Sequence, residues 1–403
     1  MSRINVAWLC HFTNSEVQNN LSLWKAKNEF APWIPNMAKA FENSSEIELH
    51  IISPHEYLKK QTSFSLRGIK YHFIPYGMPV IGRHWPWFFR YDIYSDFSKF
   101  RQRNEAIIKS IKPDVINLIG AENAYYSSAV FDAQKHAPVL VGIQGFISEF
   151  KDVNRSTQSF TTRVKTEESI IRKFKYYYGE QDSSEYLKNY NPNHVFFKIF
   201  FPVNETLAFS IPFNGYKYDC VYFGRMSKMK GAEDFIRIIA EVQKQKPDVK
   251  AIMIGSGKIS YLQYLTKKLN CEGNIEFTGF AKSQKELFEY VISSRIFIAP
   301  PHKERLSSTI REAMFLKVPI VAYATGGIPY INEHDENILL VKTGDIKAAA
   351  RKTLWLLSNE KERLALARKA YKYGLNEFGL EVYRKRLVSA YKSVIKESMK
   401  NGI

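Results

Sequence analysis

The 403-residue sequence is poor in cysteine and in long apolar runs. Its three cysteines, Cys10, Cys220 and Cys271, lie far apart and in no paired motif, which argues against a disulfide framework and a structural zinc module. No segment approaches the roughly 18 apolar residues that a membrane-spanning helix needs, and the N-terminus lacks the apolar core of a signal peptide. We therefore expect a soluble, cytoplasmic protein.

Acidic residues are also scarce relative to basic ones. The chain has 58 Lys and Arg against 40 Asp and Glu, a net charge of +18. The excess is greatest over residues 351–403, which hold 13 basic and 5 acidic residues. Such a balance suits a polyanion, an anionic membrane surface or a phosphorylated ligand, and it does not choose among them.

The length predicts two domains. Short apolar runs alternate with helix-like segments in both halves, which predicts parallel sheets covered by helices on both faces. We place an N-terminal domain at 1–210, with an irregular basic insertion at about 146–200, and a C-terminal domain at 211–380. The basic helix at 381–403 is expected to pack back toward the N-terminal domain.

Glycines and charged residues follow four predicted strands of the second half. Gly224 and Arg225 end the first, with Lys230 six residues beyond the glycine, and Gly-Ser-Gly at 255–257 ends the second. Loops at the carboxyl ends of parallel strands bind ligands. An arginine and a lysine there would suit a diphosphate. A basic turn exposed to solvent would have the same sequence pattern.

The third and fourth junctions add carboxylates and a helix start. Glu304 precedes Glu312 by eight residues, with Ser307, Ser308 and Thr309 between them, and a Gly-Gly turn follows the next strand at 326–327. Free amides at the helix start would bind an anion, and the carboxylates would accept hydrogen bonds from sugar hydroxyls. A capping box from Thr309 to Glu312 is the alternative. Together, the four junctions favour a site for a nucleotide diphosphate that carries a sugar.

These motifs resemble those of the retaining glycosyltransferases of family four, within glycosyl transferases group 1. The resemblance covers about 219–345 and implies the GT-B fold, an α/β architecture of two Rossmann-like, doubly wound parallel-sheet domains facing across a cleft. It implies that Arg225 and Lys230 bind the donor phosphates after Gly224, that Glu304 contacts the donor sugar, and that Glu312 binds the ribose.

By the same resemblance, backbone groups at Phe280 hold the base, and the amides of the Ser307, Ser308 and Thr309 segment bind phosphate. The implied activity is hexosyl or related transfer (EC 2.4) with retained anomeric configuration. No dedicated nucleophile is needed, and Arg225 and Lys230 offset the charge on the leaving group. No Asp-x-Asp pair occurs, so we expect no metal and no cofactor; the nucleotide-diphosphate sugar is a substrate.

The sequence departs from the family at four places. Arg305 stands where the family has glycine, and Tyr330 where it has glutamate. Gln144 replaces a histidine of the first domain, and the usual glycine-rich loop after the first strand is replaced by a segment that contains Asn14. Gln144 and Asn14 are therefore our candidates for the donor-sugar or acceptor side.

Aromatic and basic residues at 83–90, Arg-His-Trp-Pro-Trp-Phe-Phe-Arg, resemble an interfacial anchor, although a loop tucked into the core would read similarly. With the positive charge, this segment predicts peripheral contact with the anionic cytoplasmic face of an inner membrane. Relatives extend lipid-linked oligosaccharides of capsule, exopolysaccharide or lipopolysaccharide, so a saccharide or lipid-linked saccharide in polysaccharide biosynthesis is the expected acceptor.

Two other functions stay open. A nucleotide-sugar epimerase or a sugar phosphorylase would use the same fold. A basic nucleic-acid-binding protein would explain the charge, but the sequence has no helix-turn-helix, RNA-recognition or zinc signature, and we expect no nucleic-acid partner.

Overall fold

The computed structural model describes residues 3–13, 15–21, 33–78, 85–86, 88–150 and 157–400. The chain divides into an N-terminal unit, Met1–Pro202 together with Tyr383–Ile403, and a C-terminal unit, Val203–Val382. Asn14, one of the acceptor-side candidates, lies outside the described residues, as do Arg83 and Trp87 of the aromatic segment.

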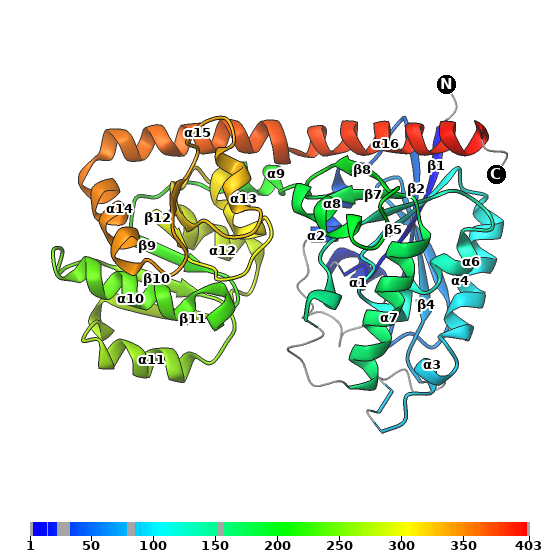
Figure 1. The fold of residues 1–403 in the computed structure, drawn as a ribbon, viewed down its shortest axis with the longest axis horizontal. Coiled ribbons are helices and arrows are strands. Elements are labelled where there is room, and N and C mark those ends of the chain that lie inside the picture. Colours follow the sequence, from blue (N-terminus) through cyan, green and yellow to red (C-terminus); the bar gives the residue numbers. More distant parts are fainter. Residues whose placement is uncertain are drawn as a thin grey trace. The chain divides into compact units, whose positions relative to one another are not determined.

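The N-terminal unit is built on an eight-stranded sheet with the order β3-β4-β2-β1-β5-β6-β7-β8. Figure 1 labels β1, β2, β4, β5, β7 and β8 of this sheet. Seven of these strands run parallel, and β3 pairs antiparallel with β4 at one edge. The strands are β1 (Ile4–Leu9), β2 (Ile47–His55), β3 (Thr62–Leu66), β4 (Ile69–Pro75), β5 (Val115–Ile119), β6 (Val139–Gly142), β7 (Tyr176–Gly179) and β8 (Val195–Lys198).

Side chains alternate between the two faces of this sheet, and a hydrophobic core covers each face over the inner strands. In β1, Val6 and Trp8 join the hydrophobic core on one face, and Ala7 and Leu9 the core on the other. The first core is completed by α2 (Trp33–Lys39) and by α16 (Leu380–Lys400), and the second by α4 (Ser98–Ile111), α6 (Val130–Ala133) and α7 (Gln158–Lys173).

Helix α16 is tied into the N-terminal core by polar groups as well as apolar ones. The hydroxyl of Tyr391 is fully buried and accepts hydrogen bonds from Nε1 of Trp8 at 2.9 Å and from Nδ2 of Asn117 at 2.8 Å. Asn117 also donates to the hydroxyl of Tyr178 at 3.2 Å. Because these donors are buried, the hydroxyl of Tyr391 is required to satisfy them.

The prediction of an irregular insertion at about 146–200 is wrong. After the short helix Ile147–Phe150 and residues outside the described chain, α7, β7, α8 (Gln181–Lys188) and β8 continue the alternation and add two parallel strands to the sheet. Tyr176, Tyr177 and Tyr178 are all buried in β7. A run of tyrosines lacks the aliphatic signal of a core strand, so the sequence pattern does not predict a strand at β7.

The C-terminal unit contains a six-stranded, fully parallel sheet with the order β11-β10-β9-β12-β13-β14. Figure 1 labels β9 to β12 of this sheet. Its strands are β9 (Tyr218–Phe223), β10 (Ala251–Ile254), β11 (Ile275–Gly279), β12 (Ser294–Ala299), β13 (Ile320–Tyr323) and β14 (Leu339–Val341). Its helices are α9 (Glu205–Ser210), α10 (Ala232–Gln243), α11 (Ile259–Lys268), α12 (Gln284–Ile292), α13 (Ser308–Phe315), α14 (Ile346–Ser358) and α15 (Glu360–Phe378). The reversal of strand order at β9 creates a switch point, where ligands bind in open sheets of this kind.

Across the part of the chain that the structure describes, no helix is both long enough and apolar enough to span a bilayer.

Candidate functional site

The four junctions that the sequence singled out follow β10, β9, β12 and β13, which are neighbours in the sheet. Their loops also bond to one another. The amide of Met226 donates to the carbonyl of Ser256 at 2.7 Å, and the amide of His302 donates to the carbonyl of Met229 at 2.9 Å. The loop after β9 is thus held between those after β10 and β12.

Two glycines make this convergence sterically feasible. Gly231 has a φ of 74°, and a Cβ atom there would lie 1.8 Å from the carbonyl oxygen of Pro300. Gly326 has a φ of 54°, and its Cβ would lie 1.5 Å from the carbonyl oxygen of Glu304. Both the left-handed conformation and the close backbone approach require glycine. These two glycines therefore allow the loops after β9 and β13 to lie against the loop after β12.

The convergence brings Lys230 and Glu304 into direct contact, although they are 74 residues apart in sequence. Nζ of Lys230 donates a hydrogen bond to Oε2 of Glu304. The Glu304 side chain is 14% exposed and that of Lys230 36%. The hydroxyl of Tyr222 donates to the carbonyls of Arg225 and Lys230, at 2.8 and 3.2 Å, and so holds the loop that carries both cations.

Arg225 is exposed at this edge, and its guanidinium makes no hydrogen bond or ion pair with any described residue. Gly224, just before it, is half-buried with a φ of 141°. An unpaired guanidinium beside a lysine provides a cationic pair to which a diphosphate could bind.

Helix α13 begins within the same loop cluster. Its N-cap residue, Ser307, gives no side-chain cap to the helix; its hydroxyl instead lies 2.7 Å from that of Thr309. Thr309 lies inside the helix rather than at the cap, so the capping box from Thr309 to Glu312 does not form. The first-turn amides, including that of the exposed Ser308, keep the capacity to bind an anion.

Glu312 lies one turn further along α13 and is 9% exposed. Its Oε1 accepts a hydrogen bond at 3.0 Å from Nε2 of Gln284 in α12. Burial raises the pKa of Glu312 from its usual 4.5 to about 7, with the hydrogen bond from Gln284 opposing the rise. A buried carboxyl group with a raised pKa, close to the loops that follow the strands, is typical of a functional site.

Phe280 follows β11, beyond β10 in the sheet, and is 58% exposed. It thus lies along the same edge, two strands from the Lys230 loop.

A hydrogen-bonded group of His302, Asp234 and Tyr323, which the sequence does not predict, lies beside these loops. Nε2 of His302 lies 2.8 Å from Oδ2 of Asp234, which also accepts a hydrogen bond at 2.9 Å from the hydroxyl of Tyr323. The carbonyl of His302 accepts from Thr325 at 3.2 Å. A histidine two residues before Glu304 was the available signal, and its carboxylate partner comes from α10, 68 residues away.

Gln144 belongs to the N-terminal unit and follows β6 at its carboxyl end. Its buried Nε2 has no hydrogen-bond partner among the described residues, and the same holds for Oε2 of Glu122, which follows the neighbouring strand β5. Burial raises the pKa of Glu122 to about 7. Buried polar atoms are normally satisfied, so this edge has hydrogen-bonding capacity that a polar ligand would use.

Among the residues that the structure describes, no three His, Cys, Asp or Glu side chains gather closely enough to hold a metal ion.

The comparisons with known proteins agree with this architecture. Residues 203–373 match the family described as Glycosyl transferases group 1. N-acetyl-alpha-D-glucosaminyl L-malate synthase of Bacillus anthracis is 24% identical over 183 residues, covering 45% of this chain and 47% of that protein. The capsular polysaccharide biosynthesis glycosyltransferase CapM of Staphylococcus aureus is 27% identical over 185 residues, covering 44% and 46%. The chain therefore spans about half the length of the curated relatives it matches.

Solved structures resemble the whole chain in fold. Sucrose-phosphate synthase from Thermosynechococcus elongatus superimposes with a TM-score of 0.71 at 14% identity, covering 98% of this chain and 100% of that one. HepE of Anabaena, solved with UDP-glucose, has a TM-score of 0.67 at 14% identity, covering 97% and 100%. The match is to group 1 as a whole, and the assignment to family four stays a prediction. The C-terminal unit is thus similar to the glycosyl transferases group 1 over nearly its whole length, and the chain has the two-domain GT-B fold.

Proposed function

We propose that this protein transfers a sugar from a nucleotide-diphosphate sugar to a saccharide or lipid-linked saccharide acceptor. The observation that carries the proposal is the contact between Lys230 and Glu304. An ammonium and a carboxylate that touch offer adjacent sites for a phosphate and for sugar hydroxyls. In a nucleotide sugar those two groups are joined through the anomeric carbon, so the bond to be broken would lie beside the pair.

The chemistry then follows from charge. Arg225 and Lys230 would stabilise the diphosphate as it leaves, because preorganised cations act where negative charge develops. Glu304 would orient the sugar, and the uncapped start of α13 would bind a phosphate oxygen. We further propose retention of anomeric configuration, with the acceptor attacking on the face that the diphosphate vacates and with no metal taking part.

The central test compares Lys230→Ala with Lys228→Ala. Both lysines lie in one short helix, Lys228–Lys230, and the two variants lose the same charge, but Lys228 is exposed and has no ion pair among the described residues. A hydrogen bond to a charged group contributes about 1.5–3 kcal/mol, so Lys230→Ala should weaken binding of the cognate nucleotide sugar about 10- to 150-fold. Lys228→Ala should change it little. Equal affinities in the two variants would refute the donor site.

Product analysis tests the reaction. Transfer to a saccharide acceptor, with the configuration of the new linkage read by NMR, would support a retaining transferase. Conversion of the nucleotide sugar without an acceptor would indicate an epimerase, and release of a sugar phosphate in the presence of inorganic phosphate would indicate a phosphorylase. Activity that persists in EDTA would support transfer without a metal.

The acceptor class is proposed from the relatives and from the surface of the N-terminal unit. CapM is named for capsular polysaccharide biosynthesis, and another relative, TuaC of Bacillus subtilis, for teichuronic acid biosynthesis. Phe88, Phe89 and Tyr94 are 73%, 50% and 72% exposed, and exposed aromatics beside basic residues suit a membrane interface. We propose peripheral contact with an anionic cytoplasmic membrane, which predicts cosedimentation with phosphatidylglycerol vesicles, and less of it with neutral ones.

A further inference from the structure

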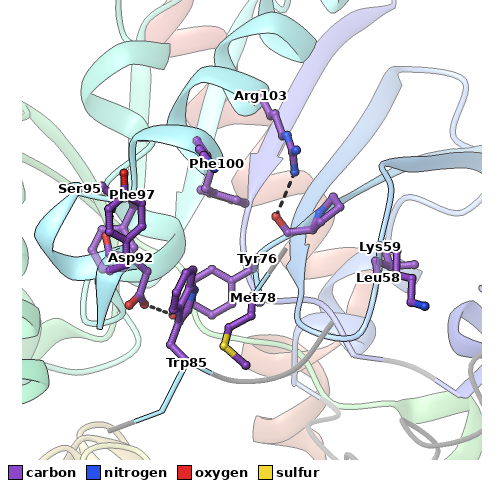
Figure 2. A pocket seen from close by; sticks show the side chains of 14 residues that line it. Leu58, Lys59, Tyr76, Met78, Trp85, Asp92, Ser95, Phe97, Phe100 and Arg103 are labelled. Carbon is purple, nitrogen blue, oxygen red and sulfur yellow. Dashed lines mark hydrogen bonds between the residues drawn. The ribbon is translucent and has the colours of Figure 1, made fainter. Parts of the chain in front are cut away.

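A cavity of about 160 Å³ lies in the N-terminal unit, at the carboxyl end of β4 (Figure 2). Tyr76, Trp85 and Phe97 are among its aromatic walls, and Lys59, Lys99 and Arg103 are its basic residues. None of the residues assigned to the donor site contributes to it. The cavity therefore has its own chemistry to explain.

The charge of the cavity is positive. Asp92 is its acidic lining residue, and it is already neutralised: Arg90 donates to Oδ1 from Nε at 2.9 Å and to Oδ2 from Nη2 at 2.7 Å, and the hydroxyl of Tyr76 donates to Oδ2 at 3.1 Å. Lys59 and Lys99 make no ion pair with any described residue.

Arg103, the third basic residue of the lining, makes no ion pair with a carboxylate of any described residue. Its one hydrogen bond to a described residue is a long one, 3.5 Å from Nη1 to the carbonyl oxygen of Pro75 (Figure 2). Three uncompensated cations around a small cavity favour an anionic ligand.

The walls select the shape of that ligand. Ligand pockets for drug-sized molecules enclose about 300–1,000 Å³, so this cavity suits a single ring. Aromatic side chains such as Trp85 offer broad apolar faces, which match the C–H face of a pyranose. The hydroxyl of Tyr76 donates to Asp92, and its oxygen can still accept a hydrogen bond from a sugar hydroxyl.

The wall formed by Phe97 is held in an uncommon backbone conformation. Asp96 and Phe97 have φ values of 48° and 53°, two consecutive left-handed residues of which neither is glycine. Such residues cost about 1–3 kcal/mol each and concentrate at ligand-binding sites. Phe97 is 5% exposed, so the surrounding packing keeps its ring in place.

The cavity adjoins the strand-end edge that carries Gln144 and Glu122. Strands β4, β2, β1, β5 and β6 are consecutive in the sheet, and the four pairings between them are parallel. The ring of Tyr76 lies 4.9 Å from that of Tyr125, which follows β5, and Tyr125 in turn lies 5.8 Å from His11, which follows β1. A chain of aromatic rings thus connects the cavity to this edge.

We propose that the cavity binds one acidic sugar residue of the acceptor, a pyranose that carries a carboxylate or a phosphate. The identification of the ligand as part of the acceptor rests on the proposed function. The recognition itself rests on the aromatic walls and on the three unpaired cations.

The test measures binding of three probes to the full chain by saturation-transfer NMR titration: methyl glucuronide, glucose 1-phosphate and neutral methyl glucoside. The acidic probes should bind at least about 10-fold more tightly than the neutral one, since charged hydrogen bonds contribute about 1.5–3 kcal/mol. The double variant Lys99→Ala/Arg103→Ala should lose that preference. Lys109→Ala, on the same helix but outside the cavity, should keep it.

Whether the carboxylate or the phosphate binds more tightly will identify the acid. Equal binding of the neutral glucoside, or a preference that survives in the double variant, would overturn the proposal. So would the absence of binding by all three probes in a protein that still binds a nucleotide sugar. The converse result, in which acidic probes bind and no nucleotide sugar does, would instead refute the proposed donor site and, with it, the identification of the ligand as part of the acceptor. The recognition of an acidic sugar by the cavity would then still stand.

Discussion

Replacing Glu312 by glutamine should make the protein more stable at alkaline pH while weakening its binding of nucleotide sugars. Burial raises the pKa of Glu312 from 4.5 to about 7. At 1.36 kcal/mol per pKa unit, the folded protein loses about 3 kcal/mol of stability by ionising this group in place. Glutamine has nearly the same shape, cannot ionise, and keeps an oxygen that accepts the hydrogen bond from Gln284.

The direction of the pH dependence follows from proton linkage. Below about pH 4.5 the carboxyl group is protonated in both the folded and the unfolded chain, and its contribution to stability is fully present. Between 4.5 and about 7 the folded protein retains a proton that the unfolded chain releases, so stability falls as the pH rises. Above about pH 7 the whole contribution of about 3 kcal/mol is lost.

Urea denaturation at pH 5 and pH 8 measures the difference. Glu312→Gln should exceed the wild type by only about 1 kcal/mol at pH 5 but by about 3 kcal/mol at pH 8. For the C-terminal unit, about 3 kcal/mol corresponds to about 6–12 °C in melting temperature. Glu336→Gln, at an exposed carboxylate, controls for the change in net charge. A difference between wild type and Glu312→Gln that is the same at both pH values would refute the reasoning.

Two further predictions concern the framework. Gly231→Ala should destabilise the C-terminal unit by more than about 1 kcal/mol and weaken nucleotide-sugar binding. Gly344 has a similar φ of 84° but no atom within 4 Å of the added Cβ, so Gly344→Ala should show the backbone cost alone. Equal melting curves and affinities for the two variants would contradict the steric argument. Tyr391→Phe should lower the free energy of unfolding by about 1–3 kcal/mol for each donor left unsatisfied, on Trp8 and Asn117, as measured by urea titration. A midpoint shift no larger than that of the same replacement at an exposed tyrosine would contradict this prediction.

Much of the C-terminal site could be predicted from the sequence, because its signals are local. Gly224, Arg225 and Lys230 follow a strand within a few residues, and the polar residues before Glu312 mark a helix start. Parallel strands place their carboxyl ends at one edge of the sheet, so the loops that follow neighbouring strands could be expected to lie close together. Strand β7 could not be predicted in this way, because three tyrosines stand where a core strand usually has aliphatic residues.

By itself, the sequence determined the alternation of strands and helices, the sheet edge at which the four motif-bearing loops gather, and the positive charge of the chain. These properties depend on periodicity, on turn residues and on composition, which are readable along the chain. Only the tertiary structure decided that Lys230 touches Glu304, that Glu312 is buried against Gln284, and that Tyr76, Trp85 and Arg103 enclose one cavity. Those facts depend on contacts between segments distant in sequence, and on which side chains lose water when the chain packs.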